Sequence, residues 1–218
     1  MRMRGWGREE IDEWCVVFSG AVARGEFGWA HRMMDGLSSG REDRIRWAFG
    51  RAMLYVRQRE YAAALDVVRG WLEAAAADDP CRSEFEHMYA DYAAVGFLAG
   101  EFSAPGTSPT LRTAAAVVEE ERPAGCPVTV ALDVQEGRSG RALSRLRRHR
   151  RGSLPGGRST RANADVLIAV CLAELGDVAG AGKAIRRATR LAPGSALIPM
   201  AHAHLATVVA RAAGGTGA

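Results

Sequence analysis

The stretch GAGKA, at residues 180–184, comes nearest to a known chemical motif in this sequence. A phosphate-binding P-loop has the form G-x-x-x-x-G-K-[ST], in which glycine amides surround the phosphates and a hydroxyl binds magnesium. Here Ala184 replaces the hydroxyl residue, and Asp177 stands where the leading glycine should be. The stretch also falls inside a predicted helix. We therefore interpret it as a turn with small packing residues and expect no bound cofactor.

A dense group of arginines lies between residues 138 and 161. Arginine pairs with phosphate and carboxylate groups. The group is therefore a solvated surface, a contact for an acidic protein such as the chain's own N-terminal half, or a contact for DNA. Residues 126–218 contain no aromatic side chains on which single-stranded bases would stack. The candidate contact residues are Arg138, Arg141, Arg145, Arg147, Arg148, Arg150 and Arg151, with His149, Arg158 and Arg161 beside them.

Carboxylates, histidines and cysteines form no catalytic or metal-binding pattern. Glu9 and Glu13 lie one helical turn apart, which a charge preference at a helix N-terminus explains, and 119–121 is a run of glutamates typical of a solvated face. His202 and His204 would point to different sides of a helix. The four cysteines lie far apart without CxxC spacing. We predict a protein with no catalytic residues and no metal ion.

Composition narrows the class of protein further. The chain has 218 residues, 48% of them hydrophobic, and no uncharged apolar stretch long enough to span a membrane. The N-terminus lacks the apolar core of a secretory signal, so we expect a cytoplasmic location. Lys183 is the only lysine among 29 basic residues, which indicates a high-GC genome, for example an actinobacterial one.

Charge is unevenly distributed along the chain. Residues 1–137 carry 15 Arg against 22 Asp and Glu, a net charge of −7. Residues 138–218 carry 14 Lys and Arg against 3 acidic residues, a net charge of +11. Opposite charges in the two parts favour an internal electrostatic contact or a partner recruited at one end.

Five similar six-residue stretches indicate an internal repeat. Their first residues are 34, 41, 37 and 39 positions apart, and 34 residues is the tetratricopeptide period. The stretches are GEFGWA (25–30), REYAAA (59–64), GEFSAP (100–105), GRSGRA (137–142) and GDVAGA (176–181).

Each stretch fits the turn of a helical hairpin. In four of the five stretches a glycine ends the first helix, because glycine adopts a left-handed conformation at the lowest cost. These glycines are Gly25, Gly100, Gly137 and Gly176. Alanine, five positions on, lies one turn into the second helix, where two helices cross closely. The third stretch departs from this pattern with Pro105 in place of alanine. The predicted packing positions are Gly25, Ala30, Ala64, Gly137, Ala142, Gly176, Ala181, Ala188 and the terminator Pro193.

The fold that follows is all-α, a superhelical array of about five helical hairpins. We expect degenerate repeats over 1–102, a loop and connecting helix over 103–125, tetratricopeptide-like repeats over 126–213, and a tail over 214–218. The segment 126–134 contains β-branched residues that would suit a strand, but the turn that follows it favours a helix.

Two stretches carry a family resemblance: VALDVQEGRSGRALSRLRRHRR, and, after a Pro/Gly loop, LGDVAGAGKAIRRATRLA with ALIPMA following it. Together they resemble the tetratricopeptide-like sensor region of MalT-type LuxR-family transcriptional regulators. In that family a P-loop ATPase precedes the repeats and a helix-turn-helix domain follows them, and neither is evident in this sequence. The resemblance implies a regulatory or scaffolding array.

These observations predict a non-catalytic protein–protein interaction module. Its partner would be a peptide or helix of another protein, bound in a concave groove that the first helices of successive hairpins form. Two alternatives stay open: a regulator component that contacts DNA through residues 138–161, and a small-molecule sensor.

Overall fold

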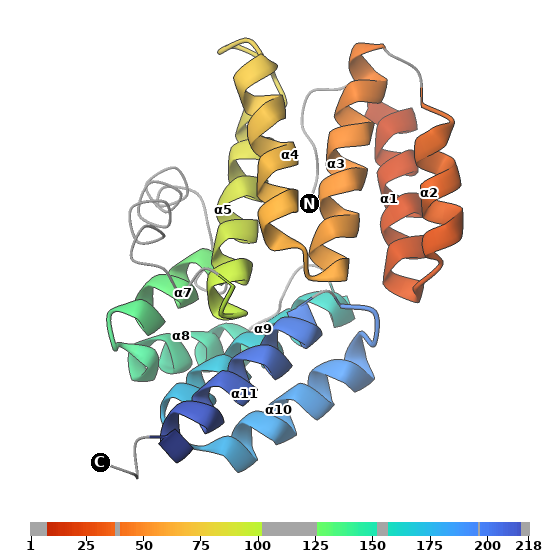
Figure 1. Ribbon diagram of the computed structural model, residues 1–218. Helices are drawn as coiled ribbons and strands as arrows, with labels where there is room; N and C mark the ends of the chain where they lie inside the picture. The colour runs from red at the N-terminus through yellow and green to blue at the C-terminus, as the bar shows by residue number, and fades with distance from the viewer. Residues whose placement is uncertain (1–7, 38–39, 102–125, 152–156, 196, 215–218) are drawn as a thin grey trace. The chain divides into compact units, whose positions relative to one another are not determined.

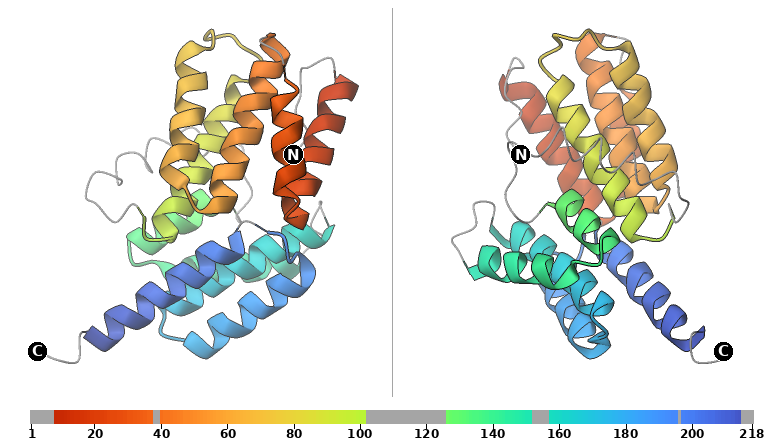
Figure 2. Two further views of the ribbon diagram at one scale, coloured as in Figure 1. Left: turned by 45° about the vertical axis from the view of Figure 1, so that its right-hand side comes forward. Right: turned by 90° about the vertical axis from the view of Figure 1, so that its left-hand side faces the viewer.

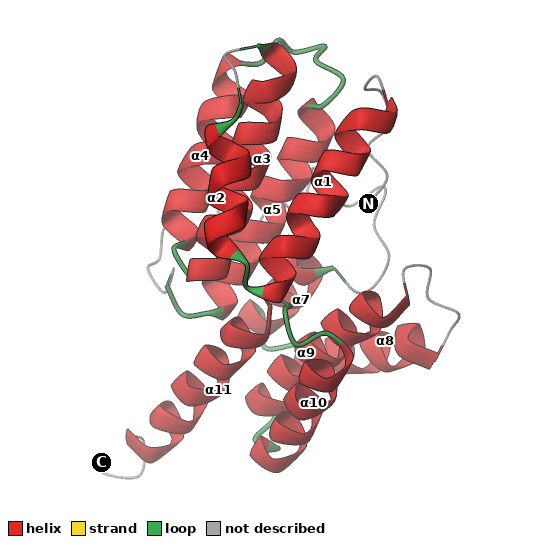
Figure 3. Cartoon of the chain, turned by 90° about the vertical axis from the view of Figure 1, so that its right-hand side faces the viewer, coloured by secondary structure: helices red, strands yellow, loops and turns green. Residues whose placement is uncertain are grey.

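The computed structural model describes residues 8–37, 40–101, 126–151, 157–195 and 197–214. Every regular element in these ranges is a helix, and none is a strand (Figure 3). The all-α prediction is therefore confirmed, whereas the superhelical arrangement of five hairpins stays a prediction. Within the described ranges, none of the helices combines the length and apolarity needed to cross a lipid bilayer.

The chain forms two compact units, Met1–Tyr92 and Ala93–Ala218. Unit 1 contains α1 (Arg8–Arg24), α2 (Phe27–Asp35), α3 (Arg41–Gln58) and α4 (Tyr61–Ala74), and α5 (Arg82–Leu98) begins in it (Figure 1). Unit 2 contains the end of α5 and then α7 (Pro127–Gln135), α8 (Ser139–Arg151), α9 (Gly157–Glu174), α10 (Val178–Leu191) and α11 (Leu197–Gly214). The predicted segment 103–125 lies outside the described residues.

Left-handed residues separate the helices at the repeated turns. Gly25, Gly100, Gly137 and Gly176 have φ of 79°, 81°, 70° and 81°. At the second turn Arg59 takes this conformation, with φ of 68°, although a left-handed conformation costs a non-glycine residue free energy. The second helix predicted for the third hairpin, after Gly100, would fall in residues outside the described ranges.

Small side chains lie where the paired helices pack. Ala30, Ala64, Ala142, Ala181 and Ala188 are all fully buried. Pro193 follows α10, which ends at Leu191, where a proline stops a helix from continuing.

In unit 1, α3 packs on both helices of the preceding hairpin, α1 and α2. The approach is closest at Gly50, where an added Cβ would lie 2.5 Å from Met34 Sδ and 3.0 Å from Phe18 Cζ. Phe18 and Met34 belong to a buried cluster with Val22, Ala30 and Leu54. One face of α3 is thus committed to the core of unit 1.

In unit 2, α9 is the central helix and contacts α7, α8, α10 and α11 (Figure 2). Residues 164–173 of α9 are buried at every position, as expected for a helix covered on all sides. Residues 127–135 form α7, with Pro127 in its first turn, so the helical interpretation of this segment is confirmed and the strand alternative is wrong.

Candidate functional site

An open apolar groove lies on the surface of unit 1 between α3 and α4. Its volume is ≈ 530 Å³. We call it the Trp47–Trp71 groove. The residues that line it are Arg44, Trp47, Ala48, Asp66, Val67, Gly70, Trp71 and Ala74.

Helical spacing places these side chains on one surface. On α3 the contributing positions are 44, 47 and 48, which are three and four residues apart and therefore neighbours on the helix surface. On α4 the positions are 66, 67, 70, 71 and 74, again about one turn apart. The hairpin α3–α4 therefore has a second apolar surface that no other described helix covers completely.

Trp47 and Trp71 have different environments. Trp47 is 45% exposed, a large value for an indole. Trp71 is half-buried, and its ring stacks on Phe85 of α5 with centroids 3.9 Å apart. Trp71 is therefore a fixed wall of the groove, while Trp47 presents its apolar ring to solvent.

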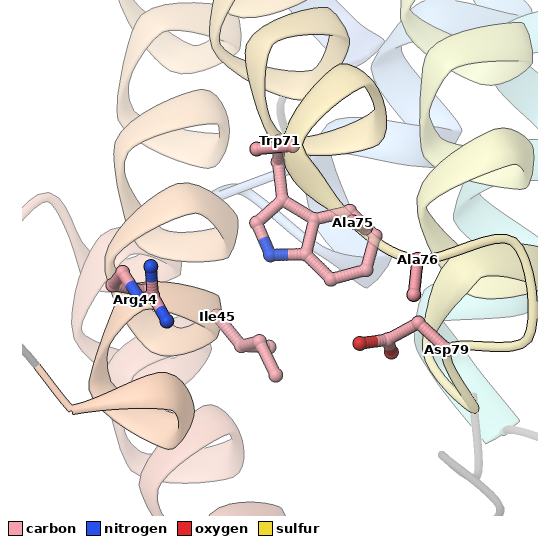
Figure 4. A pocket seen from close by; sticks show the side chains of 7 residues that line it. Arg44, Ile45, Trp71, Ala75, Ala76 and Asp79 are labelled. Carbon is pink, nitrogen blue, oxygen red and sulfur yellow. The ribbon is translucent and has the colours of Figure 1, made fainter.

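A smaller pocket of ≈ 260 Å³ continues the groove toward the end of α4 and shares Arg44, Trp71 and Ala74 with it. Figure 4 shows the Trp71 indole between Ile45 on the α3 side and Asp79 in the loop after α4. Arg82 fixes this loop, because its Nη1 donates to the carbonyl oxygens of Leu72 at 3.1 Å and Ala75 at 3.3 Å. A basic side chain at these last carbonyls stabilises the C-terminal end of α4.

Small residues keep the groove open. An added Cβ at Gly70, within α4, would meet no other atom within 4 Å. Glycine inside a helix is less stable than alanine by about 0.8–1.0 kcal/mol, and no packing contact in unit 1 requires it here. Ala48 and Ala74 also line the groove with single methyl groups. A partner backbone can therefore approach the surface closely.

The predicted arginine contacts divide into two groups, of which the first is engaged inside unit 2. Arg138 Nε lies 3.2 Å from Asp133 Oδ1, and Arg145 Nη2 contacts the other oxygen of the same carboxylate. Arg150 Nε lies 2.8 Å from Asp165 Oδ1. Asp133 and Asp165 are 3% and 0% exposed. A buried carboxylate needs such charged partners, so these three arginines have a structural role.

The second group faces solvent. Arg141, Arg147 and Arg148 are exposed, and no hydrogen bond or ion pair joins them to other side chains of the described residues. Arg151 is the last residue of α8.

The sequence reasoning missed both buried aspartates. Asp133 stands in the apolar run VALDV and Asp165 in ADVLIAV, and a single carboxylate within an apolar helix is a signal for a buried ion pair. It also missed the structural role of His204, whose Nδ1 donates to the Leu98 carbonyl at 2.8 Å. The two residues are 106 positions apart in the sequence, so no local pattern reveals this contact.

His204 also joins α11 to α9. Its Nε2 lies 2.8 Å from Glu174 Oε1. Contact with His204, assisted by Arg211, holds the pKa of Glu174 below its ordinary value even though burial opposes this shift.

Metal and thiol chemistry has little support in the described part of the chain. No group of three or more His, Cys, Asp or Glu side chains there is placed to hold a metal ion. All four cysteines are buried, and burial raises the pKa of Cys171 to about 12, which keeps this thiol protonated. The GAGKA stretch lies within α10, and Asp177 caps that helix by accepting a hydrogen bond from the Gly180 amide at 2.8 Å.

Comparison of the chain with protein-family models, with curated proteins and with solved structures gives no match.

Proposed function

We propose that this chain is a non-catalytic protein-interaction module that binds an apolar helix or peptide of another protein in the Trp47–Trp71 groove. The observation that carries this proposal is the exposed Trp47 ring beside a groove walled by Trp71. Tryptophan is enriched among the residues that dominate binding energy at protein interfaces.

The expected contribution of Trp47 can be estimated from its exposure. A large aromatic side chain buries about 150–250 Å² when fully covered. Covering the exposed 45% would remove roughly 100 Å² from water, which stabilises a complex by on the order of 2 kcal/mol. A single anchor of this size, with neighbouring contacts, suits a transient partner.

The shape of the groove favours a helix or an extended peptide over a compact surface. The groove and the adjoining pocket follow one side of the α3–α4 hairpin, and Gly70 and Ala74 leave room for a backbone between the two tryptophans. Arg44 and Asp66 at its edge offer one charge of each sign, which can orient a partner. The sequence predicted a groove formed by the first helices of successive hairpins. The Trp47–Trp71 groove instead lies between α3 and α4, the first and second helices of one hairpin.

A small apolar molecule is a second candidate occupant. The groove volume of ≈ 530 Å³ lies within the range of about 300–1,000 Å³ that is typical of ligand sites. This candidate corresponds to the sensor alternative, and the regulatory setting rests on the repeat spacing and the family resemblance.

Selection of helical peptides from a display library against the full chain tests the proposal. We expect the selected peptides to share apolar residues at helical spacing and to lose affinity for the variant Trp47→Ala. The matched control is Trp29→Ala, because Trp29 is 36% exposed on α2 and does not line the groove.

Two outcomes would contradict the proposal. One is that the peptides bind Trp47→Ala and wild type equally. The other is that peptides fail while apolar small molecules raise the melting temperature of wild type but not of Trp47→Ala, which would favour the sensor.

A further inference from the structure

The arginines of α8 have different environments, because some pair with buried aspartates and others are exposed. Arg145 and Arg150 turn toward α7 and α9, where Asp133 and Asp165 bind them. Arg187 of α10 also reaches Asp165, at 3.2 Å. These contacts fix α8 against the core of unit 2, so its exposed arginines are presented on a rigid support.

In the described residues, no acidic side chain pairs with the outward face of α8, which we define as Arg141, Arg147 and Arg148. The acidic residues just before α8, Asp133 and Glu136, pair with Arg138. Residues 138–218 contain three acidic residues. Asp165 binds Arg150 and Arg187, Glu174 contacts His204, and Asp177 caps α10. Each of the three is therefore already engaged inside unit 2.

We propose that the outward face of α8 binds an acidic helical segment of a partner protein. This proposal is independent of the Trp47–Trp71 groove, which lies in the other unit. Arginine forms paired, charge-assisted hydrogen bonds with carboxylates, so three exposed guanidinium groups provide both attraction and orientation.

The spacing of the arginines suits a helix. Arg141 and Arg148 are seven residues apart, which places them on the same side of α8 about 10 Å from each other. Carboxylates seven residues apart on a facing helix have the same separation. Gly140 and Ser144, on this exposed side, leave room for the partner, and the Ser144 hydroxyl already donates to the Gly140 carbonyl.

Nucleic acid fits this face less well. Proteins that bind duplex DNA through its phosphates commonly make about 6–10 such contacts, whereas three exposed arginines are present on this face. The exposed positions between them, Gly140 and Ser144, offer no Asn or Gln side chain to read base edges.

Fluorescence anisotropy with two labelled probes tests the proposal on the full chain. One probe is a synthetic alanine-based helix with glutamates at seven-residue spacing, and the other is a short DNA duplex. We expect the acidic helix to bind wild type at low salt and to lose about tenfold in affinity for the triple variant Arg141→Gln, Arg147→Gln, Arg148→Gln.

A variant of α10 removes the same amount of charge from unit 2 and serves as the control. Lys183, Arg186 and Arg190 are exposed, and we expect their triple glutamine variant to change affinity less than about twofold. Far-UV circular dichroism checks that both variants keep their helices.

Three results would overturn the proposal: no binding of the acidic helix by wild type, equal losses in both triple variants, or tighter binding of the duplex with loss in the α8 variant. The second would show an effect of net charge alone, and the third would assign the face to nucleic acid.

Discussion

Replacing Gly70 by leucine should stabilise unit 1 and, at the same time, block its groove. Gly70 lies within α4, four residues before the helix ends at Ala74, and its position is exposed. A Cβ there meets no atom within 4 Å, so the first carbon of the new side chain causes no clash. Most of the leucine side chain would then occupy the space between Trp47 and Trp71.

The size of the stabilisation follows from helix propensity. Leucine is close to alanine on this scale, so the substitution should gain about 0.8 kcal/mol. For a domain of this size, a gain of 1 kcal/mol raises the melting temperature by about 4–8 °C. We therefore expect an increase of roughly 3–6 °C in the unfolding transition of unit 1.

Two measurements on the same sample test this expectation. Thermal denaturation followed by circular dichroism gives the stability, and anisotropy of a peptide selected on wild type gives the affinity, which should fall at least tenfold. Because the two effects have opposite signs, loss of folding cannot explain loss of binding. Unchanged affinity, or a lower melting temperature, would refute the reasoning about the groove.

Three further predictions concern the packing and the ion pairs. Gly50→Ala should destabilise unit 1 by about 1–3 kcal/mol in urea denaturation, since its Cβ would lie 2.5 Å from Met34 Sδ; a neutral result would mean that α3 is not held this closely. The double variant Arg150→Ala, Arg187→Ala should destabilise unit 2 by about 3 kcal/mol in urea denaturation, because it leaves the fully buried Asp165 carboxylate without these partners. Asp165→Ala should cost less, because the two arginines that it leaves are partly exposed to water, and the reverse order would contradict this assignment. The pKa of Glu174 is lower in the folded state than its ordinary 4.5, so the stability it supplies is present above pH 4.5 and is lost as the pH falls through the folded-state value. Urea denaturation across this range should show a smaller loss of stability in Glu174→Gln than in wild type, and equal losses would contradict the assignment.

The turns of the fold could be predicted from the sequence, because each turn depends on the conformational preferences of a few neighbouring residues. A left-handed turn favours glycine, and four of the five turns have a glycine with positive φ. Arg59 shows the limit of this rule, since a non-glycine residue holds the same conformation at the second turn.

The groove could not be predicted, because exposure depends on which helices cover a side chain. Trp14 and Trp47 are equivalent in the sequence as aromatic residues in helices. In the structure Trp14 stacks on Phe18 at 4.7 Å against the core of unit 1, whereas Trp47 is 45% exposed. Similarly, Arg145 and Arg147 are only two residues apart in the sequence. In the structure Arg145 pairs with the buried Asp133, whereas Arg147 is exposed.

Fluorine NMR of the chain labelled with fluorotryptophan is the most direct test of groove binding. It follows each indole separately while a selected helical peptide is added. We expect the signals of Trp47 and Trp71 to shift with the peptide concentration and that of Trp29 to stay in place. Shifts at Trp29 with unchanged signals from Trp47 and Trp71 would contradict the proposal that this groove is the binding site.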